Sequence, residues 1–248
     1  MLDRPDPTTF DGFVALADDH LILGHRLSEW CGHAPMLEED LSLANMALDL
    51  IGQARVLYAH AGEIEGAGRA EDDLAYLRDE RAFRNCLLVE RQNGDFAHTM
   101  LRQFYFAAAM APYWAAAQAS SDETLRALAG KARKETAYHL RHSAEWVIRL
   151  GDGTEESAVR MADAVDSLHP YTGDLFEQEG PTEVFPERTT LKREWEETVA
   201  RVFSEAGLTV PDLPYPQIGG RQGLHGEELG HMLAQMQYLP RAHPGARW

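Results

Sequence analysis

The spacing of the apolar residues is the strongest constraint in this sequence, because it follows the period of an α-helix through almost every long segment. In residues 9–32, apolar side chains recur three and four positions apart, a spacing that gathers them on one helix face. No segment alternates apolar and polar residues convincingly, as a half-buried strand would. We therefore predict an all-α protein, with further helices at about 36–61, 79–90, 93–119, 121–150, 155–177, 189–206 and 225–239.

Four of the predicted helices are long enough to form a four-helix bundle, namely 9–32, 36–61, 93–119 and 121–150. The second is apolar on most of its circumference, which is typical of a central helix. One of its stripes contains Leu37, Leu41, Ala44, Leu48 and Ile51, and the other contains Leu43, Met46, Leu50 and Leu57. A narrow polar seam separates them, formed by Glu38, Ser42, Asn45, Asp49 and Gln53.

Local signals indicate where several helices begin and end. Gly62 is expected to end the second helix, and Asn93 to cap the third. Ser120 and Glu123 have the spacing of a capping box at the start of the fourth. Pro240 is expected to end the last helix.

Near the C-terminus a segment rich in proline and glycine interrupts the helical pattern. Residues 208–224, LTVPDLPYPQIGGRQGL, are too irregular for a helix and too apolar for a free linker, so we expect an extended strap packed across the bundle. The whole chain, 1–248, is predicted to be one domain. Its core bundle covers about 9–177, and a C-terminal helix, the strap and a last helix cover about 187–240.

The charge of the chain excludes several kinds of partner. The 248 residues contain 23 Lys and Arg against 40 Asp and Glu, a net charge of −17, which repels nucleic acid and anionic lipid. The most apolar run, 104–119, is shorter than the ~20 residues of a membrane-spanning helix. With no signal-peptide pattern and with Cys31 and Cys86 interpreted as buried thiols, we expect a cytoplasmic protein with neither nucleic-acid nor membrane partners.

One stretch raises the question of a metal site. In KETAYHL, residues 134–140, Glu135 and His139 are four positions apart. Helical bundles that hold two iron ions use Glu-x-x-His, three apart, on two of their helices. Three positions before His139 stands Thr136, a poor iron ligand. On the second helix the inward acid is Asp49, and Gly52 stands three positions later without any ligand.

The other helices do not supply the missing ligands. We expect Asp18 and Asp19 to lie off the core stripe of the first helix, and Asp95 and His98 off that of the third. A true Glu-x-x-His occurs at 228–231, but it lies after the strap and has no second copy in a bundle helix, so we interpret it as structural or solvent-facing.

A di-iron site needs four carboxylates and two histidines, and the sequence offers two or three inward polar groups. We therefore expect no catalytic, cofactor-binding or metal site in this chain. Asp49, Gly52, Thr136 and His139 are interpreted as degenerate ligand positions. A hydrogen-bonded polar cluster inside the bundle is the expected alternative, formed by Asn45, Asp49, Glu135 and His139.

Four long segments resemble one known family, the C subunits of bacterial ring-1,2-phenylacetyl-CoA epoxidases. They are SEWCGHAPMLEEDLSLANMALDLIGQAR (28–55), NGDFAHTMLRQF (93–104), KETAYHLRHSAEWVIRLGDGTEES (134–157) and GLHGEELGHMLAQMQYLPRAHPGARW (223–248). The resemblance covers nearly the whole chain and implies a ferritin-like helical bundle.

The resemblance also implies a role in a multicomponent monooxygenase of aerobic phenylacetate breakdown. In that family a related A subunit holds the di-iron centre, and the C subunit pairs with it as a structural component. A small B subunit bridges the pairs, and a reductase with flavin and an iron–sulfur cluster delivers electrons from NADPH. No catalytic residue carries over to this chain.

Two other functions remain open at this point. One is an autonomous di-iron carboxylate oxidase or ferroxidase, which the ligand count disfavours. The other is a module that binds CoA thioesters through the basic residues Lys131, Arg133 and Lys134, although a solvated helix face would look the same.

Overall fold

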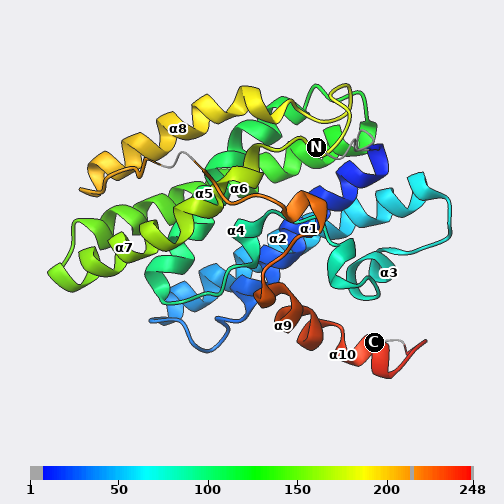
Figure 1. Cartoon of the computed structure of the whole chain (residues 1–248), viewed down its shortest axis with the longest axis horizontal. Helices are drawn as coiled ribbons and strands as arrows, with labels where there is room; N and C mark the ends of the chain where they lie inside the picture. The colour runs from blue at the N-terminus through cyan, green and yellow to red at the C-terminus, as the bar shows by residue number, and fades with distance from the viewer. Residues whose placement is uncertain (1–7, 213–214, 247–248) are drawn as a thin grey trace.

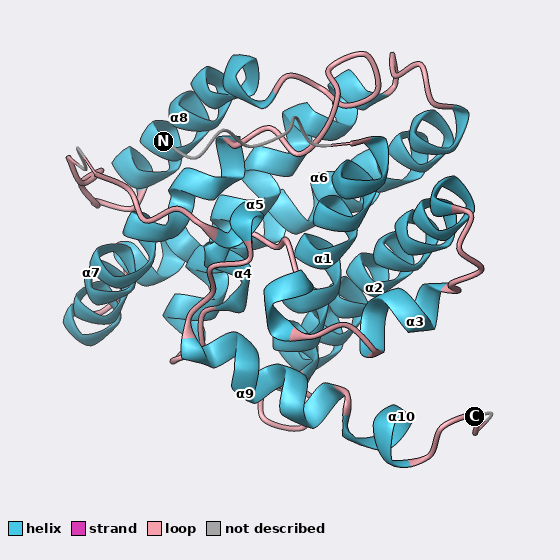
Figure 2. Cartoon of the chain, turned by 45° about the vertical axis from the view of Figure 1, so that its right-hand side comes forward, coloured by secondary structure: helices cyan, strands magenta, loops and turns pink. Residues whose placement is uncertain are grey.

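The computed structural model describes residues 8–212 and 215–246, and over these ranges the chain is helical without a β-strand (Figure 2). The prediction of an all-α protein is thus confirmed. The elements, in chain order, are α1 (Thr9–Ser28), α2 (Leu37–Glu65), α3 (Glu71–Tyr76), η1 (Glu80–Ala82), α4 (Leu87–Glu90), α5 (Phe96–Ala117), α6 (Glu123–Gly151), α7 (Glu155–Leu168), η2 (His169–Phe176), α8 (Arg188–Glu205), η3 (Gly220–Gln222), α9 (Glu227–Met236) and α10 (Tyr238–Ala242), where η marks a 3₁₀ helix.

Two helical hairpins form the bundle. The α1 helix packs along α2, and α5 packs along α6. The α7 and α8 helices lie on the α5 side of the bundle, whereas α9 and α10 lie beyond the opposite edge (Figure 1). None of the described helices combines the length and apolarity needed to cross a lipid bilayer.

The most buried long helices are α1, with 15 of its 20 residues buried, and α5, and the prediction that the second helix is central is wrong. Sixteen of the 22 residues of α5 are buried. On α2, the stripe of Leu43, Leu50 and Leu57 is buried in the core, whereas Leu37 and Leu48 are 70 % and 69 % exposed. Apolar periodicity shows that α2 has two apolar stripes, but it does not show that only one of them is covered within this chain.

The end of α2 differs from the prediction at Gly62. The helix continues through this residue to Glu65, and Gly66 ends it in the left-handed conformation with φ 68°. Gly62 is needed for a different reason, since a Cβ atom there would collide with the backbone carbonyl of Arg69, where the chain turns back.

Aspartates provide the N-terminal caps that other residues were expected to provide. Asp95, rather than Asn93, accepts a hydrogen bond from the backbone N–H of His98 at 3.1 Å and begins α5. Asp122, rather than Ser120, accepts one from Leu125 at 2.8 Å and begins α6. The Ser120 hydroxyl instead donates to the carbonyl of Val184 at 2.6 Å.

Three of the shorter predicted helices are divided. Residues 79–90 form η1 and α4, residues 155–177 form α7 followed by η2, and residues 225–239 form α9 followed by α10. Pro240 lies inside α10 rather than ending a helix. Proline is tolerated there because the first helical turn has no intrahelical acceptor for its N–H. The predicted strap, 208–224, is irregular apart from η3, with residues 213–214 outside the described ranges.

Candidate functional site

A ladder of polar contacts joins α2 to α6, and we call it the α2/α6 seam. It consists of five cross-helix pairs: Glu39–His142 at 2.8 Å, Ser42–Tyr138 at 3.4 Å, Asp49–His139 at 3.1 Å, Gln53–Glu135 at 2.9 Å and His60–Asp122 at 2.9 Å. Residue numbers rise along one helix and fall along the other, so the two helices run antiparallel. Ser42, Asp49 and Gln53 of the polar seam on the second helix therefore face α6, whereas Glu38 and Asn45 are exposed.

The middle of the seam contains most of the predicted polar cluster. The imidazole Nε2 of His139 lies 3.1 Å from Asp49 Oδ2, and His139 is 1 % exposed. Glu135 lies one turn away on α6 and accepts hydrogen bonds from other groups. Asn45 is exposed and does not belong to the cluster, whereas Gln53 does.

Glu135 is held from two sides. The amide Nε2 of Gln53 donates to its Oε2 at 2.9 Å, and the ammonium of Lys131 lies 3.2 Å from its Oε1. Both carboxylate oxygens are thus engaged by side chains of this protein. These contacts tie Glu135 to α2 and to the preceding turn of α6.

At the two ends of the seam, histidine again meets a carboxylate. Glu39 is 6 % exposed, and its Oε2 lies 2.8 Å from His142 Nε2. Asp122 both caps α6 and contacts His60. Burial alone would raise the pKa of Asp122, but its hydrogen bonds with Leu125 N–H and His60 outweigh burial and hold the pKa below its usual value.

The residues present do not fit a di-iron centre. At the degenerate ligand positions, Thr136 is buried without a carboxylate, and a side chain at Gly52 would extend into open space. The central histidine of α1, His20, is fully buried, and burial lowers its pKa to about 4. Within residues 8–212 and 215–246, no three His, Cys, Asp or Glu side chains gather where they could hold a metal ion.

The structure corrects the expectation for the two carboxylates of α1. Asp18 and Asp19 are completely buried. Asp18 forms an ion pair with the guanidinium of Arg78 and accepts a hydrogen bond from the hydroxyl of Tyr58. Asp19 pairs with Arg221 at 2.7 Å and accepts the backbone N–H of Cys86 at 2.7 Å. Their guanidinium partners are 60 and 202 positions away in sequence, so no local pattern could indicate that these acids are internal.

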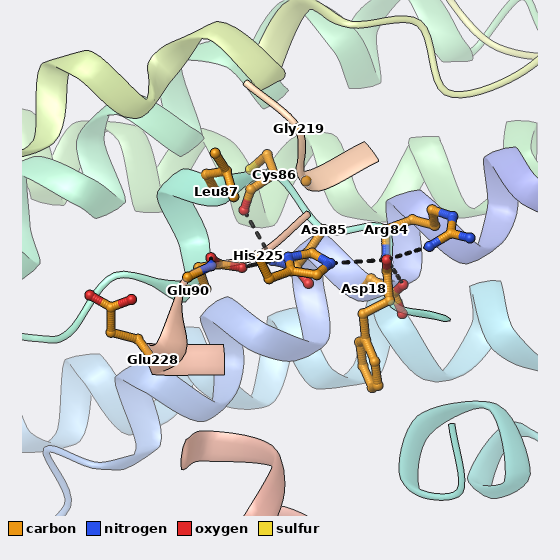
Figure 3. A network of polar contacts seen from close by, with 12 residues as sticks. Asp18, Arg84, Asn85, Cys86, Leu87, Glu90, Gly219, His225 and Glu228 are labelled. Atoms are coloured by element: carbon orange, nitrogen blue, oxygen red, sulfur yellow. Dashed lines mark hydrogen bonds and ion pairs between the residues drawn. The ribbon is translucent and has the colours of Figure 1, made fainter. Parts of the chain in front are cut away.

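A second polar network, shown in Figure 3, attaches the strap to the bundle. The Glu90 carboxylate lies 2.7 Å from His225 Nδ1 and accepts the backbone N–H of Gly226 at 2.7 Å. Burial alone would lower the pKa of His225, but Glu90 outweighs it and raises the pKa. Asp174 accepts the backbone N–H groups of Gly219 and Gly220 at 2.9 and 3.0 Å. The network therefore anchors the chain on both sides of η3.

The remaining candidates of the sequence have structural roles or exposed positions. In the Glu-x-x-His at 228–231, Glu228 pairs with Arg91 at 2.8 Å and His231 is exposed. His98 contacts the cap residue Asp95 at 2.7 Å. Of the two cysteines, Cys86 is buried, but Cys31 is exposed, contrary to expectation.

The fold and the seam together define a class: a ferritin-like helical bundle in which paired polar side chains join α2 to α6. The whole chain, residues 1–248, matches the family of phenylacetic acid catabolic proteins, and it belongs to that family. It is 46 % identical over 241 residues to the C subunit of the 1,2-phenylacetyl-CoA epoxidase of Escherichia coli strain K12, covering 95 % of this chain and 97 % of that protein. This similarity confirms the resemblance identified in the sequence.

Proposed function

We propose that this chain is the non-catalytic structural subunit of a multicomponent monooxygenase that epoxidises the aromatic ring of phenylacetyl-CoA in aerobic phenylacetate breakdown. The similarity to the C subunit of an enzyme with that name supports the reaction and the membership in a complex. The observation that carries the non-catalytic role is the loss of ligands at the bundle's motif positions, where Thr136 is buried without a carboxylate and Gly52 has no side chain.

In this proposal the chemistry belongs to partner chains. A related A subunit holds the di-iron centre and the substrate, a small B subunit bridges the pairs, and a reductase with flavin and iron–sulfur groups supplies electrons from NADPH. The present chain supplies a rigid helical surface on which the A subunit is held. The proposal places the assembly in the cytoplasm, where a reducing environment keeps thiols such as Cys31 and Cys86 free.

The autonomous oxidase fits the side chains poorly. Iron would need several carboxylates and histidines around one point, whereas the seam contains separate histidine–carboxylate pairs along two helices. Thr136 and Gly52, at the positions where the bundle motif needs ligands, offer neither a carboxylate nor an imidazole.

Reconstitution tests the proposal. The chain, the di-iron subunit, the bridging subunit and the reductase are combined with phenylacetyl-CoA, NADPH and oxygen, and epoxide formation is measured with each component omitted in turn. We expect turnover only when both this chain and the di-iron subunit are present. Full epoxidation without this chain, or epoxidation by this chain and the reductase alone, would contradict the proposal.

A further inference from the structure

The outer side of α2 carries leucines where a solvent-facing helix carries polar groups. Leu37, Leu41 and Leu48 are 70 %, 56 % and 69 % exposed, and their spacing of four and seven places them on one side of the helix. On α6, Tyr138 is 37 % exposed, and its hydroxyl lies 3.4 Å from Ser42, the residue after Leu41. We call Leu37, Leu41, Leu48 and Tyr138 the leucine face.

Basic residues border the leucine face on α6. The α6 helix contains six Lys or Arg and three Glu, a local charge of +3, in a chain whose net charge is −17. Lys134 and Arg141 share the helix side of Tyr138, and the Arg141 guanidinium lies 5.8 Å from its ring centre. Neither Lys134 nor Arg141 forms an ion pair with a described acidic residue.

Other sides of the bundle differ from this one. The α7 and α8 helices cover α5, and α3 and α4 pack on α1. The outer side of α8 carries internal ion pairs, Lys192–Glu196, Arg193–Glu197 and Arg201–Glu205, which is typical of a helix facing water. No exposed large apolar side chain lies on α8, all of which is described.

The size of the surface formed by α2 and α6 suits a helical partner. Each helix has 29 residues, which corresponds to a length of about 43 Å. Two helices about 10 Å apart then present roughly 800 Å², close to one side of a standard protein–protein interface. Leucines at these spacings form a ridge that fits the groove between side-chain rows of another helix.

We propose that the leucine face, bordered by Lys134 and Arg141, is the surface on which the di-iron subunit docks, through helices that present an apolar ridge with carboxylates along its edge. This inference rests on the proposed function, which requires such a partner. Charge complementarity carries the choice of occupant, because the basic border would attract an acidic edge and would repel another basic one.

The experiment measures the affinity of the full-length chain for the purified di-iron subunit by titration calorimetry. Leu41→Asp and Leu48→Asp place a charge in the centre of the face, and Lys134→Glu with Arg141→Glu reverses its border. Val159→Asp is the matched control, since Val159 is an exposed apolar residue on α7, 65 % exposed. Circular dichroism melting verifies that each variant folds.

The leucine variants should weaken the complex at least ~30-fold, as expected for central interface residues. The charge-reversal variant should bind more slowly and lose most of its salt dependence, and Val159→Asp should bind within about threefold of the parent chain. If the parent binds and the leucine variants bind equally well, the proposed face is wrong while the proposed function stands. If the parent does not bind the di-iron subunit at all, the proposed function itself fails.

Two further outcomes would also overturn this assignment. Light scattering of the chain alone at about 100 µM could reveal a dimer that Leu48→Asp dissolves, and the occupant would then be a second copy. Calorimetry with free CoA could show binding that the charge-reversal variant loses while its affinity for the di-iron subunit is unchanged, and the basic border would then be a nucleotide site.

Discussion

Gln53 on α2 donates its side-chain amide hydrogen to Glu135 on α6 at 2.9 Å. An amide thus engages the carboxylate one turn from His139, whose own imidazole lies 3.1 Å from Asp49. The Lys131 ammonium, 3.2 Å from the other oxygen, balances the charge of Glu135. Five side-chain pairs across the seam make it a structural joint between α2 and α6 in our account.

Removing the central histidine of the seam should weaken the fold and spare the chemistry. His139→Ala leaves a cavity beside Asp49, with an expected loss of ~1–3 kcal/mol in the free energy of unfolding. His139→Gln can keep one hydrogen bond and should lose less. Chemical denaturation of the isolated chain measures both. In the reconstituted complex, turnover per intact complex should remain substantial below the melting range, and unchanged stability with lost turnover would show that His139 has a chemical role.

Two glycines inside helices should respond to alanine in opposite directions. Gly62→Ala places a methyl group against the Arg69 carbonyl, so the free energy of unfolding should fall by about 1–3 kcal/mol. Gly130→Ala meets nothing within 4 Å in the middle of α6 and should raise it by ~0.5–1 kcal/mol. Thermal melting of the two variants beside the parent checks this, and equal shifts would contradict the close approach at Arg69.

Breaking the buried pair between α1 and the strap should be costly. Asp19→Ala leaves the guanidinium of Arg221 without its buried carboxylate, and such a loss typically costs ~3–5 kcal/mol. Asp163→Ala removes a mostly exposed acid and serves as the control, with a change within about 0.5 kcal/mol. Hydrogen exchange should show faster opening of residues 219–226 in Asp19→Ala alone.

Two buried histidines should give opposite dependences of stability on pH. The folded pKa of His225 is raised, so its contribution is full below its unfolded pKa of about 6.5 and is lost as pH rises through the folded value. The folded pKa of His20 is lowered to about 4. Its neutral form is favoured in the fold, so stability falls as pH drops from about 6.5 towards 4.

Unfolding free energies measured between pH 4.5 and 9 test this pair. Relative to the parent, His225→Gln should lose more stability at pH 6 than at pH 9, and His20→Leu should flatten the decline below about pH 6.5. His231→Gln changes an exposed histidine and should leave both trends in place. Parallel curves for parent, His225→Gln and His20→Leu would contradict the burial and the Glu90 contact as causes.

The apolar periodicity is sufficient to predict the helices, but it does not predict how deeply each helix is buried. Both α2 and α5 are apolar around most of their circumference, yet α5 is covered by α6, α7 and α8, whereas α2 keeps Leu37 and Leu48 exposed. An apolar helix face that binds another chain has the same residue types as one that is buried in the core of its own chain. A single sequence therefore does not distinguish the two. The contact between Asp49 and His139, by contrast, follows from the sequence, because helical spacing places both side chains on the inward faces of their helices.

The internal ion pairs could not be predicted, because their partners are remote in the chain. In the sequence, Asp18 and Asp19 are typical of an exposed turn of a helix. In the structure they are internal, because Arg78 and Arg221 pair with them. Gln53 was visible in the polar seam of the second helix, but its bond to Glu135 depends on the register between α2 and α6. Register follows from packing, which helical spacing alone leaves undetermined.

The central claim is that the seam is a joint between helices rather than a metal centre. The most direct measurement is elemental analysis of the purified full-length chain after anaerobic loading with ferrous iron and a chelator wash, with the di-iron subunit treated in parallel. We expect the partner to retain iron and this chain to retain far less than one iron per molecule. Close to two irons per chain after the wash would contradict the account.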